Sequence, residues 1–111
     1  MEKKERPKIV QSKTVRVECG CGHIYVTIGR VDEELFEVFT TLGKAGGCAY
    51  AQNEALTRCI TTGFRYGVPV GEYTRQLKEI RCPTMNIDEG EEVLSCAHAI
   101  AIALEREVYL Q

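Results

Sequence analysis

A glycine-rich segment followed by a predicted helix is the part of this sequence best suited to bind an anion. Residues 43–47 read Gly-Lys-Ala-Gly-Gly, and a helix is predicted over residues 50–66. Glycine has no Cβ, so the backbone can adopt positive φ and approach a ligand closely. The first turn of a helix adds unpaired N–H groups and the positive end of the helix dipole, which together favour a phosphate. We therefore expect an anion site at this loop, with Lys44 as its charged partner.

Two arginines on the same predicted helix extend this site. Arg58 and Arg65 are seven residues apart and so share one side of the helix, from which they could reach a second phosphate or a ligand held across a subunit interface. The candidate ligand-binding residues are Gly43, Lys44, Gly46, Gly47, Asn53, Arg58 and Arg65. The spacing of the glycines matches neither a Walker loop nor a dinucleotide fingerprint. The alternative is a strand-to-helix connection whose glycines only turn the chain.

The chain has six cysteines, a number that would suggest disulfides in a small secreted protein. The charged N-terminus lacks the apolar segment of a secretory signal, so we expect reduced thiols in a cytoplasmic protein. Cys48 and Cys59 are expected to pack as structural residues. The other four could hold a structural zinc ion: Cys19, Cys21, Cys82 and Cys96. Only one residue separates the first two, where about two to four are usual, so buried free thiols are the alternative.

Cys96 has a second candidate role, because it opens the last predicted helix directly after Ser95, a good N-cap residue. A helix N-terminus lowers a thiol pKa, and His98 is two residues further along. A Cys-His nucleophile would also need a shared cleft, an orienting acid and an oxyanion site, which the sequence does not show in recognisable form. We therefore expect no catalytic residue.

Four segments, in this order and spacing, resemble the TSCPD domain, a module found at the C-terminus of vitamin B12-dependent ribonucleotide reductases and as short stand-alone proteins. They are His23 to Ile28, Leu35 to Gly47, Leu77 to Pro83 and Leu94 to Ala101. The motif that names the family, Thr-Ser-Cys-Pro-Asp, is Leu94-Ser95-Cys96-Ala97-His98 here. The resemblance implies a nucleotide-like ligand, since the parent enzymes handle ribonucleotides.

Length and composition indicate one globular domain. The chain has 111 residues, of which 44% are hydrophobic and 27% charged, enough to bury a core. A net charge of −2 gives no general attraction to nucleic acid or to an anionic membrane, and no apolar run is long enough to cross a bilayer. We expect neither nucleic acid nor membrane as a partner.

The expected fold class is α+β. Residues 14–18, 23–28 and 35–42 read as strands of an antiparallel meander, followed by helices over 50–66, over 71–80 and from 95 onward. Residues 87–92 read as an exposed acidic connection. Residues 1–13 are expected to form a flexible charged arm, and residues 14–111 a single TSCPD-like domain.

Two features predict a homo-oligomer. The last helix is apolar on nearly all faces, and Gly63 lies in the apolar stripe of the helix over 50–66. That stripe is expected to contain Leu56, Cys59, Ile60, Gly63 and Phe64. A glycine there indicates close contact with the sheet or with another subunit.

The sequence thus predicts a non-catalytic, oligomeric module that binds an anionic nucleotide or cyclic-nucleotide-like molecule. By resemblance it would act in trans as an accessory or regulatory piece of ribonucleotide reduction, with a reductase large subunit as partner. One alternative is a phage-type protein that sequesters nucleotide immune messengers. Another is a zinc-stabilised structural interaction domain without a small ligand.

Overall fold

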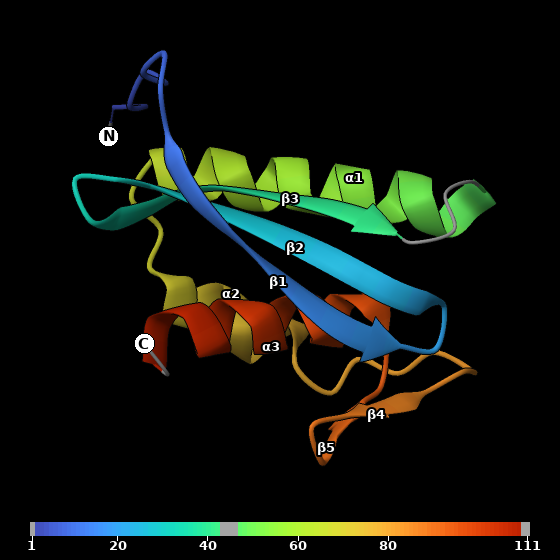
Figure 1. The fold of residues 1–111 in the computed structure, drawn as a ribbon. Coiled ribbons are helices and arrows are strands. Elements are labelled where there is room, and N and C mark those ends of the chain that lie inside the picture. Colours follow the sequence, from blue (N-terminus) through green and yellow to red (C-terminus); the bar gives the residue numbers. More distant parts are fainter. Residues whose placement is uncertain (1, 43–46, 110–111) are drawn as a thin grey trace.

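The computed structural model describes residues 2–42 and 47–109 and confirms the predicted order of a three-stranded antiparallel sheet followed by helices (Figure 1). The elements are β1 (Gln11–Cys19), β2 (Gly22–Val31), β3 (Glu34–Leu42), α1 (Gly47–Arg65), α2 (Val70–Leu77), β4 (Asn86–Asp88), β5 (Glu91–Val93) and α3 (Cys96–Tyr109). The sheet order is β1-β2-β3, with β4 and β5 as a separate hairpin.

The inner face of the sheet follows from the alternation of apolar residues along its strands. Val17 pairs with Ile24, and Ile28 pairs with Val38. All four are at most 1% exposed. Because side chains alternate between the faces of a strand, this register gathers the apolar residues on one side.

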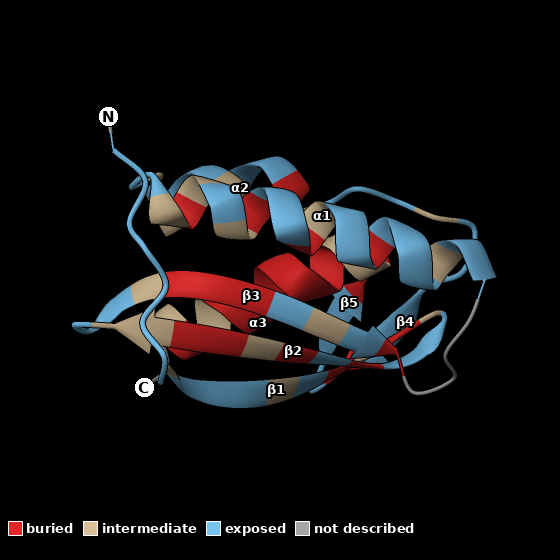
Figure 2. Cartoon of the chain, turned by 90° about the horizontal axis from the view of Figure 1, so that it is seen from above, coloured by how far each residue is buried: buried red, intermediate tan, exposed pale blue. Residues whose placement is uncertain are grey.

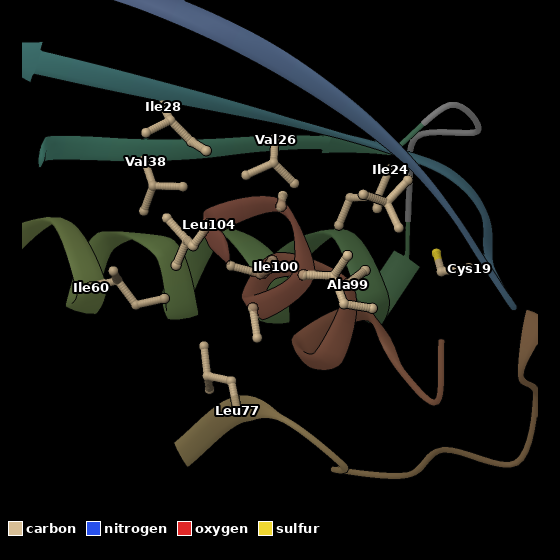
Figure 3. Packing of buried hydrophobic residues seen from close by; sticks show 14 of the residues in the cluster. Cys19, Ile24, Val26, Ile28, Val38, Ile60, Leu77, Ala99, Ile100 and Leu104 are labelled. Carbon is tan, nitrogen blue, oxygen red and sulfur yellow. The ribbon is translucent and has the colours of Figure 1, made fainter. Parts of the chain in front are cut away.

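Helix α3 covers this inner face and is itself covered nearly all round (Figure 3). Residues 99–104 form a run of alanine, isoleucine and leucine in which no residue is more than 1% exposed. The sheet lies on one side of α3 and α2 on the other. The sheet and α2 of the same chain therefore bury the apolar faces of α3, for which the sequence had suggested a second subunit. The apolar character of this helix is then no argument for an oligomer.

Helix α1 lies beside the outer edge of β3 (Figure 2). The Thr61 hydroxyl donates to the Val38 carbonyl and accepts from the Val38 N–H, both at 3.0 Å. It thereby satisfies backbone groups that an edge strand leaves unpaired. The buried residues of α1 are Asn53, Thr57, Ile60 and Phe64. The predicted stripe was therefore partly wrong, because Cys59 is exposed. Cys48 is exposed as well, so neither cysteine packs as the sequence predicted.

Gly63 does make a close contact, but its partner is α2 rather than the sheet or another subunit. A Cβ at Gly63 would lie 1.6 Å from the Tyr73 hydroxyl oxygen. The Tyr73 ring in turn packs edge-on against Phe64, with ring centroids 5.4 Å apart. The glycine thus lets α1 and α2 approach each other.

Gly63→Ala should lower the free energy of unfolding by about 1–3 kcal/mol, because the new methyl group overpacks this contact. In a Tyr73→Phe background the loss should be smaller, since the nearest atom is the hydroxyl oxygen. Urea denaturation of the two single variants and the double variant measures the coupling. Equal losses in both backgrounds would contradict a Gly63–Tyr73 contact.

The acidic segment over residues 87–92 is exposed as predicted except at Asp88, but it belongs to the β4–β5 hairpin, which was not predicted. Asp88 is buried, accepts a 2.9 Å bond from the Glu18 N–H and pairs with Arg106 of α3 at 2.6 Å. Burial alone would raise the Asp88 pKa, but the Glu18 N–H and the Arg106 guanidinium outweigh it and lower the pKa. The hairpin is therefore tied to both β1 and α3.

Asp88→Asn should lower the free energy of unfolding by about 1.5–3 kcal/mol at pH 7, the cost of losing a charge-assisted bond. A depressed folded-state pKa means that ionised Asp88 stabilises the fold above about pH 4 and that this contribution disappears as the pH falls through the lowered pKa. The difference between variant and parent should therefore shrink below about pH 4. A difference independent of pH, in denaturation series at several pH values, would contradict this.

The first strand takes up the end of the predicted N-terminal arm. Gln11 to Lys13 belong to β1, so the strand begins inside the predicted arm. Arg6 forms two bonds to the buried carboxylate of Glu37, at 2.7 and 3.1 Å. The Lys4 N–H also donates to the Arg65 carbonyl at 2.9 Å. These contacts hold the segment before β1 against β3 and the end of α1.

Candidate functional site

A pocket of about 410 Å³ lies between α1, residues 80–82 and the start of α3. This volume is within the range of small-molecule sites, roughly 300–1,000 Å³. Its lining includes apolar side chains, two amides and three thiols: Cys21, Ala49, Gln52, Asn53, Leu56, Ile80, Arg81, Cys82, Ser95, Cys96 and Ala97.

This pocket differs from four other pockets in the charged residues that line it. Arg81 is the single charged residue here, apart from any ionised thiol, and no hydrogen bond or ion pair of its guanidinium is found among residues 2–42 and 47–109. Three other pockets share Arg30, which pairs with Glu107 at 3.1 Å. A fourth pocket shares Arg81 and is also lined by Glu79, Glu91 and Glu92, so the guanidinium lies between the two hollows. Of these five pockets, the one lined by α1 and the start of α3, called the Arg81 pocket below, has a cation and no carboxylate in its lining.

The N-terminus of α3 forms one wall of the pocket. The predicted N-cap is confirmed, because the Ser95 hydroxyl accepts a 3.0 Å bond from the His98 N–H. The Ser95 carbonyl accepts the first intrahelical bond, from the Ala99 N–H at 2.9 Å. The N–H groups of Cys96 and Ala97 precede that bond and have no carbonyl partner within the helix. They add positive electrostatic potential to the pocket.

Asn53 supplies a buried donor without an acceptor. The residue is 5% exposed, and its Nδ2 atom has no hydrogen-bond partner among the described residues. Buried polar atoms are nearly always paired, and an unpaired one costs about 1–3 kcal/mol. Asn53 lines the pocket, but its Nδ2 atom is shielded from solvent, so a ligand acceptor would reach it only after the amide rotates.

Two of the four predicted zinc ligands are in contact. The sulfurs of Cys19 and Cys96 are 3.9 Å apart. The hydrogen bond from the Cys96 thiol lowers the pKa of Cys19, whereas the same contact and then burial raise the pKa of Cys96. The Asn53 amide lies close enough to Cys96 to lower the Cys96 pKa by donating to a thiolate, so this amide is unpaired only while Cys96 is protonated. The raised Cys96 pKa shows that the expected lowering at the helix N-terminus was wrong, since the neighbouring thiol and burial outweigh the dipole.

Within the part of the chain that the structure describes, no set of side chains forms a metal centre. Among these residues no group of three or more His, Cys, Asp or Glu side chains is arranged to hold a metal ion. The Cys82 thiol donates instead to the Thr84 carbonyl at 2.8 Å. The His98 Nδ1 accepts from the Leu94 N–H at 3.3 Å, so this ring nitrogen is engaged with the turn before α3. A zinc site stays a prediction of the sequence.

The predicted ligand-binding residues fall into separate groups. Gly43, Lys44 and Gly46 lie outside the described residues, and Gly47 begins α1 with φ 74°. Arg58 is exposed and pairs with Glu54 at 3.3 Å. Arg65 donates to the Lys4 carbonyl and stacks on the Phe36 ring, about 27 Å along α1 from Gly47.

Of the predicted ligand-binding residues that the structure describes, Gly47 and Asn53 lie at the pocket end of α1. Arg81 was not among the residues predicted from the sequence. Its position between Ile80 and Cys82, inside a segment that carries the family resemblance, was the available signal.

The fold is that of a small α+β domain with a pocket at the N-terminus of α3. A family model, the TSCPD domain, matches residues 1–108, and the chain belongs to this family. No curated protein and no solved structure matches the chain. No helix within the described residues is long and apolar enough to cross a membrane.

Asn53→Leu should leave the free energy of unfolding of the unliganded protein unchanged or raise it by about 1 kcal/mol, because it removes an unpaired buried donor. The matched control is Gln52→Leu, an exposed residue of the same helix, for which a change within about 0.5 kcal/mol is expected. Urea denaturation without ligand measures both. A loss of more than about 2 kcal/mol for Asn53→Leu would show that the Nδ2 atom is satisfied in solution.

Proposed function

We propose that this protein is a non-catalytic module that binds a small anionic, nucleotide-like ligand in the Arg81 pocket. The observation that carries the proposal is the buried, unpaired Asn53 amide in a pocket with a cation and no carboxylate. Such a donor is costly in the free protein and is satisfied when the amide rotates toward an acceptor on the ligand.

The two kinds of surface in the pocket suit the two parts of a nucleotide. The Arg81 guanidinium and the free N–H groups of α3 would bind the phosphate, through charge-assisted bonds and the helix dipole. Leu56, Ile80 and Ala49 offer an apolar wall against which a base can pack. No residue is assigned a catalytic role, because none of the three thiols or the Ser95 hydroxyl that line the pocket is hydrogen-bonded to a side-chain general base within the described residues.

The biological role that we propose follows from the family. A short TSCPD chain that binds a nucleotide would serve ribonucleotide reduction in trans, in the cytoplasm, as an accessory to a reductase large subunit. Sequestration of a nucleotide messenger is the alternative, and the preferred ligand separates the two. A homo-oligomer stays a prediction that light scattering can test.

The test is calorimetry with inorganic phosphate, AMP, ADP, dATP and a cyclic dinucleotide as probes. Arg81→Gln should weaken the best of these about 10-fold, as expected for the loss of a charge-assisted bond. Arg75→Gln is the matched control: it makes the same charge change on α2, where Arg75 pairs with Glu72 outside the pocket. Its affinity should equal that of the parent.

Two further variants test where on the protein the ligand binds. Asn53→Leu should reduce binding while the fold keeps its stability, which separates a binding role from a structural one. Lys44→Ala tests the loop predicted from the sequence: a weaker affinity would extend the site toward that loop. Parent-like binding by both Arg81→Gln and Asn53→Leu would overturn the pocket as the ligand site.

A further inference from the structure

The contact between Cys19 and Cys96 joins two distant parts of the chain. Cys19 ends β1 and is 1% exposed, and its sulfur lies at the edge of the buried cluster (Figure 3). Cys96 is the first residue of α3, is partly exposed and lines the Arg81 pocket. Their sulfurs are 3.9 Å apart, near van der Waals contact.

The backbone on both sides of this contact is held in place. A Cβ at Gly20 would lie 2.3 Å from the Thr84 carbonyl oxygen, so the β1–β2 turn packs directly on the segment before β4. The Asn86 amide donates to the Cys19 carbonyl at 3.3 Å. On the other side, the Ser95 cap fixes the start of α3. Because the backbone is held on both sides, the sulfurs would have to close from 3.9 Å to a bonding distance of about 2.0 Å mainly through side-chain rotation.

We propose that Cys19 and Cys96 form a reversible dithiol–disulfide site, oxidised by a low-molecular-weight disulfide of the glutathione class that enters through the Arg81 pocket. Cys96 is the thiol that such a reagent can reach, and Cys19 is the buried thiol that completes the bond. Neither the family nor the proposed ligand site assigns this role to the pair. The proposal does not depend on ligand binding, so the two can fail separately.

The reaction is two thiol–disulfide exchanges. Cys96 gives up its proton and attacks one sulfur of the external disulfide RSSR, which forms Cys96–S–SR and releases RS⁻, protonated to RSH. Because the pKa of Cys96 is raised, little of its thiolate is present at neutral pH and this first exchange is slow. Cys19 then gives up its proton and attacks the Cys96 sulfur, which breaks the mixed disulfide and releases a second RSH. The two thiols lose two electrons and two protons, and RSSR gains them as two RSH.

The bond would stabilise the fold strongly, because it closes a long segment of chain. It would join the end of β1 to the start of α3, and the closed loop would contain all the elements from β2 to β5. Constraining so long a loop in the unfolded chain should raise the melting temperature by on the order of 10 °C. Dithiothreitol should reverse the rise.

The experiment uses the full chain with Cys48→Ser and Cys59→Ser, so that two exposed thiols of α1 do not form mixed disulfides. The reduced protein is incubated with oxidised glutathione, alkylated, digested and analysed by mass spectrometry. The expected product is a peptide pair linked through Cys19 and Cys96, with the higher melting temperature. Cys96→Ser should abolish both, whereas Cys21→Ser, which removes a neighbouring thiol of the same pocket, should leave both unchanged.

Three results would overturn the proposal. The first is Cys19 recovered fully alkylated while Cys96 carries glutathione, which would mean that the second exchange does not occur. The second is a link from Cys96 to Cys21 or Cys82. The third is zinc found in the purified protein by elemental analysis and lost from Cys96→Ser, since the thiols would then be metal ligands.

Discussion

The burial of α3 against the inner face of the sheet is the interaction on which the rest of this structure depends. Three strands expose one apolar face, and a nearly all-apolar helix cannot be left in water, so each provides the cover that the other needs. The fully buried run over residues 99–104 shows how complete this cover is. The remaining elements are arranged around that contact: α2 closes the far side of α3, and α1 closes the edge of β3.

The pocket results from the way in which α3 and α1 pack on the sheet. Burial of α3 fixes its first turn near the end of β1, and the side-by-side placement of α1 and β3 brings Asn53 to the same region. The N-terminus of α3, the Asn53 amide and the Cys19–Cys96 contact therefore share one end of the molecule. The altered family motif, residues 94–98, lies at this end, where Ser95 caps the helix and Cys96 lines the pocket.

Ion pairs form at several points where elements of the described chain meet. The buried carboxylates Glu37, Asp88 and Glu107 have arginine partners, Arg6, Arg106 and Arg30. These pairs tie the N-terminal segment to β3, the hairpin to α3 and the end of α3 to β2. Such pairs hold elements in register because a buried charge without its partner is costly. The Arg81 guanidinium has no such partner within the described chain, which is why it is suited to a ligand.

The periodicity of the sequence was enough to predict the meander, the three helices and the nature of α3, because alternation with period two and apolar stripes are local properties of the chain. Local pattern could not show which face of α1 is buried. The helix packs on a strand edge through Thr61, and a hydroxyl that bonds to a backbone is invisible to a hydrophobicity count. The β4–β5 hairpin was missed for a similar reason, since what holds Asp88 is a partner 18 residues away on α3.

The sequence by itself determined the family, the α+β class and the presence of thiols and amides capable of binding. Only the tertiary structure decided which of them meet: Arg58 and Arg65 are engaged elsewhere on α1, whereas Asn53, Arg81 and Cys96 come together from three segments. It also decided that one chain covers α3. Both outcomes depend on contacts between residues far apart in the chain, and these follow from packing in three dimensions rather than from spacing along the sequence.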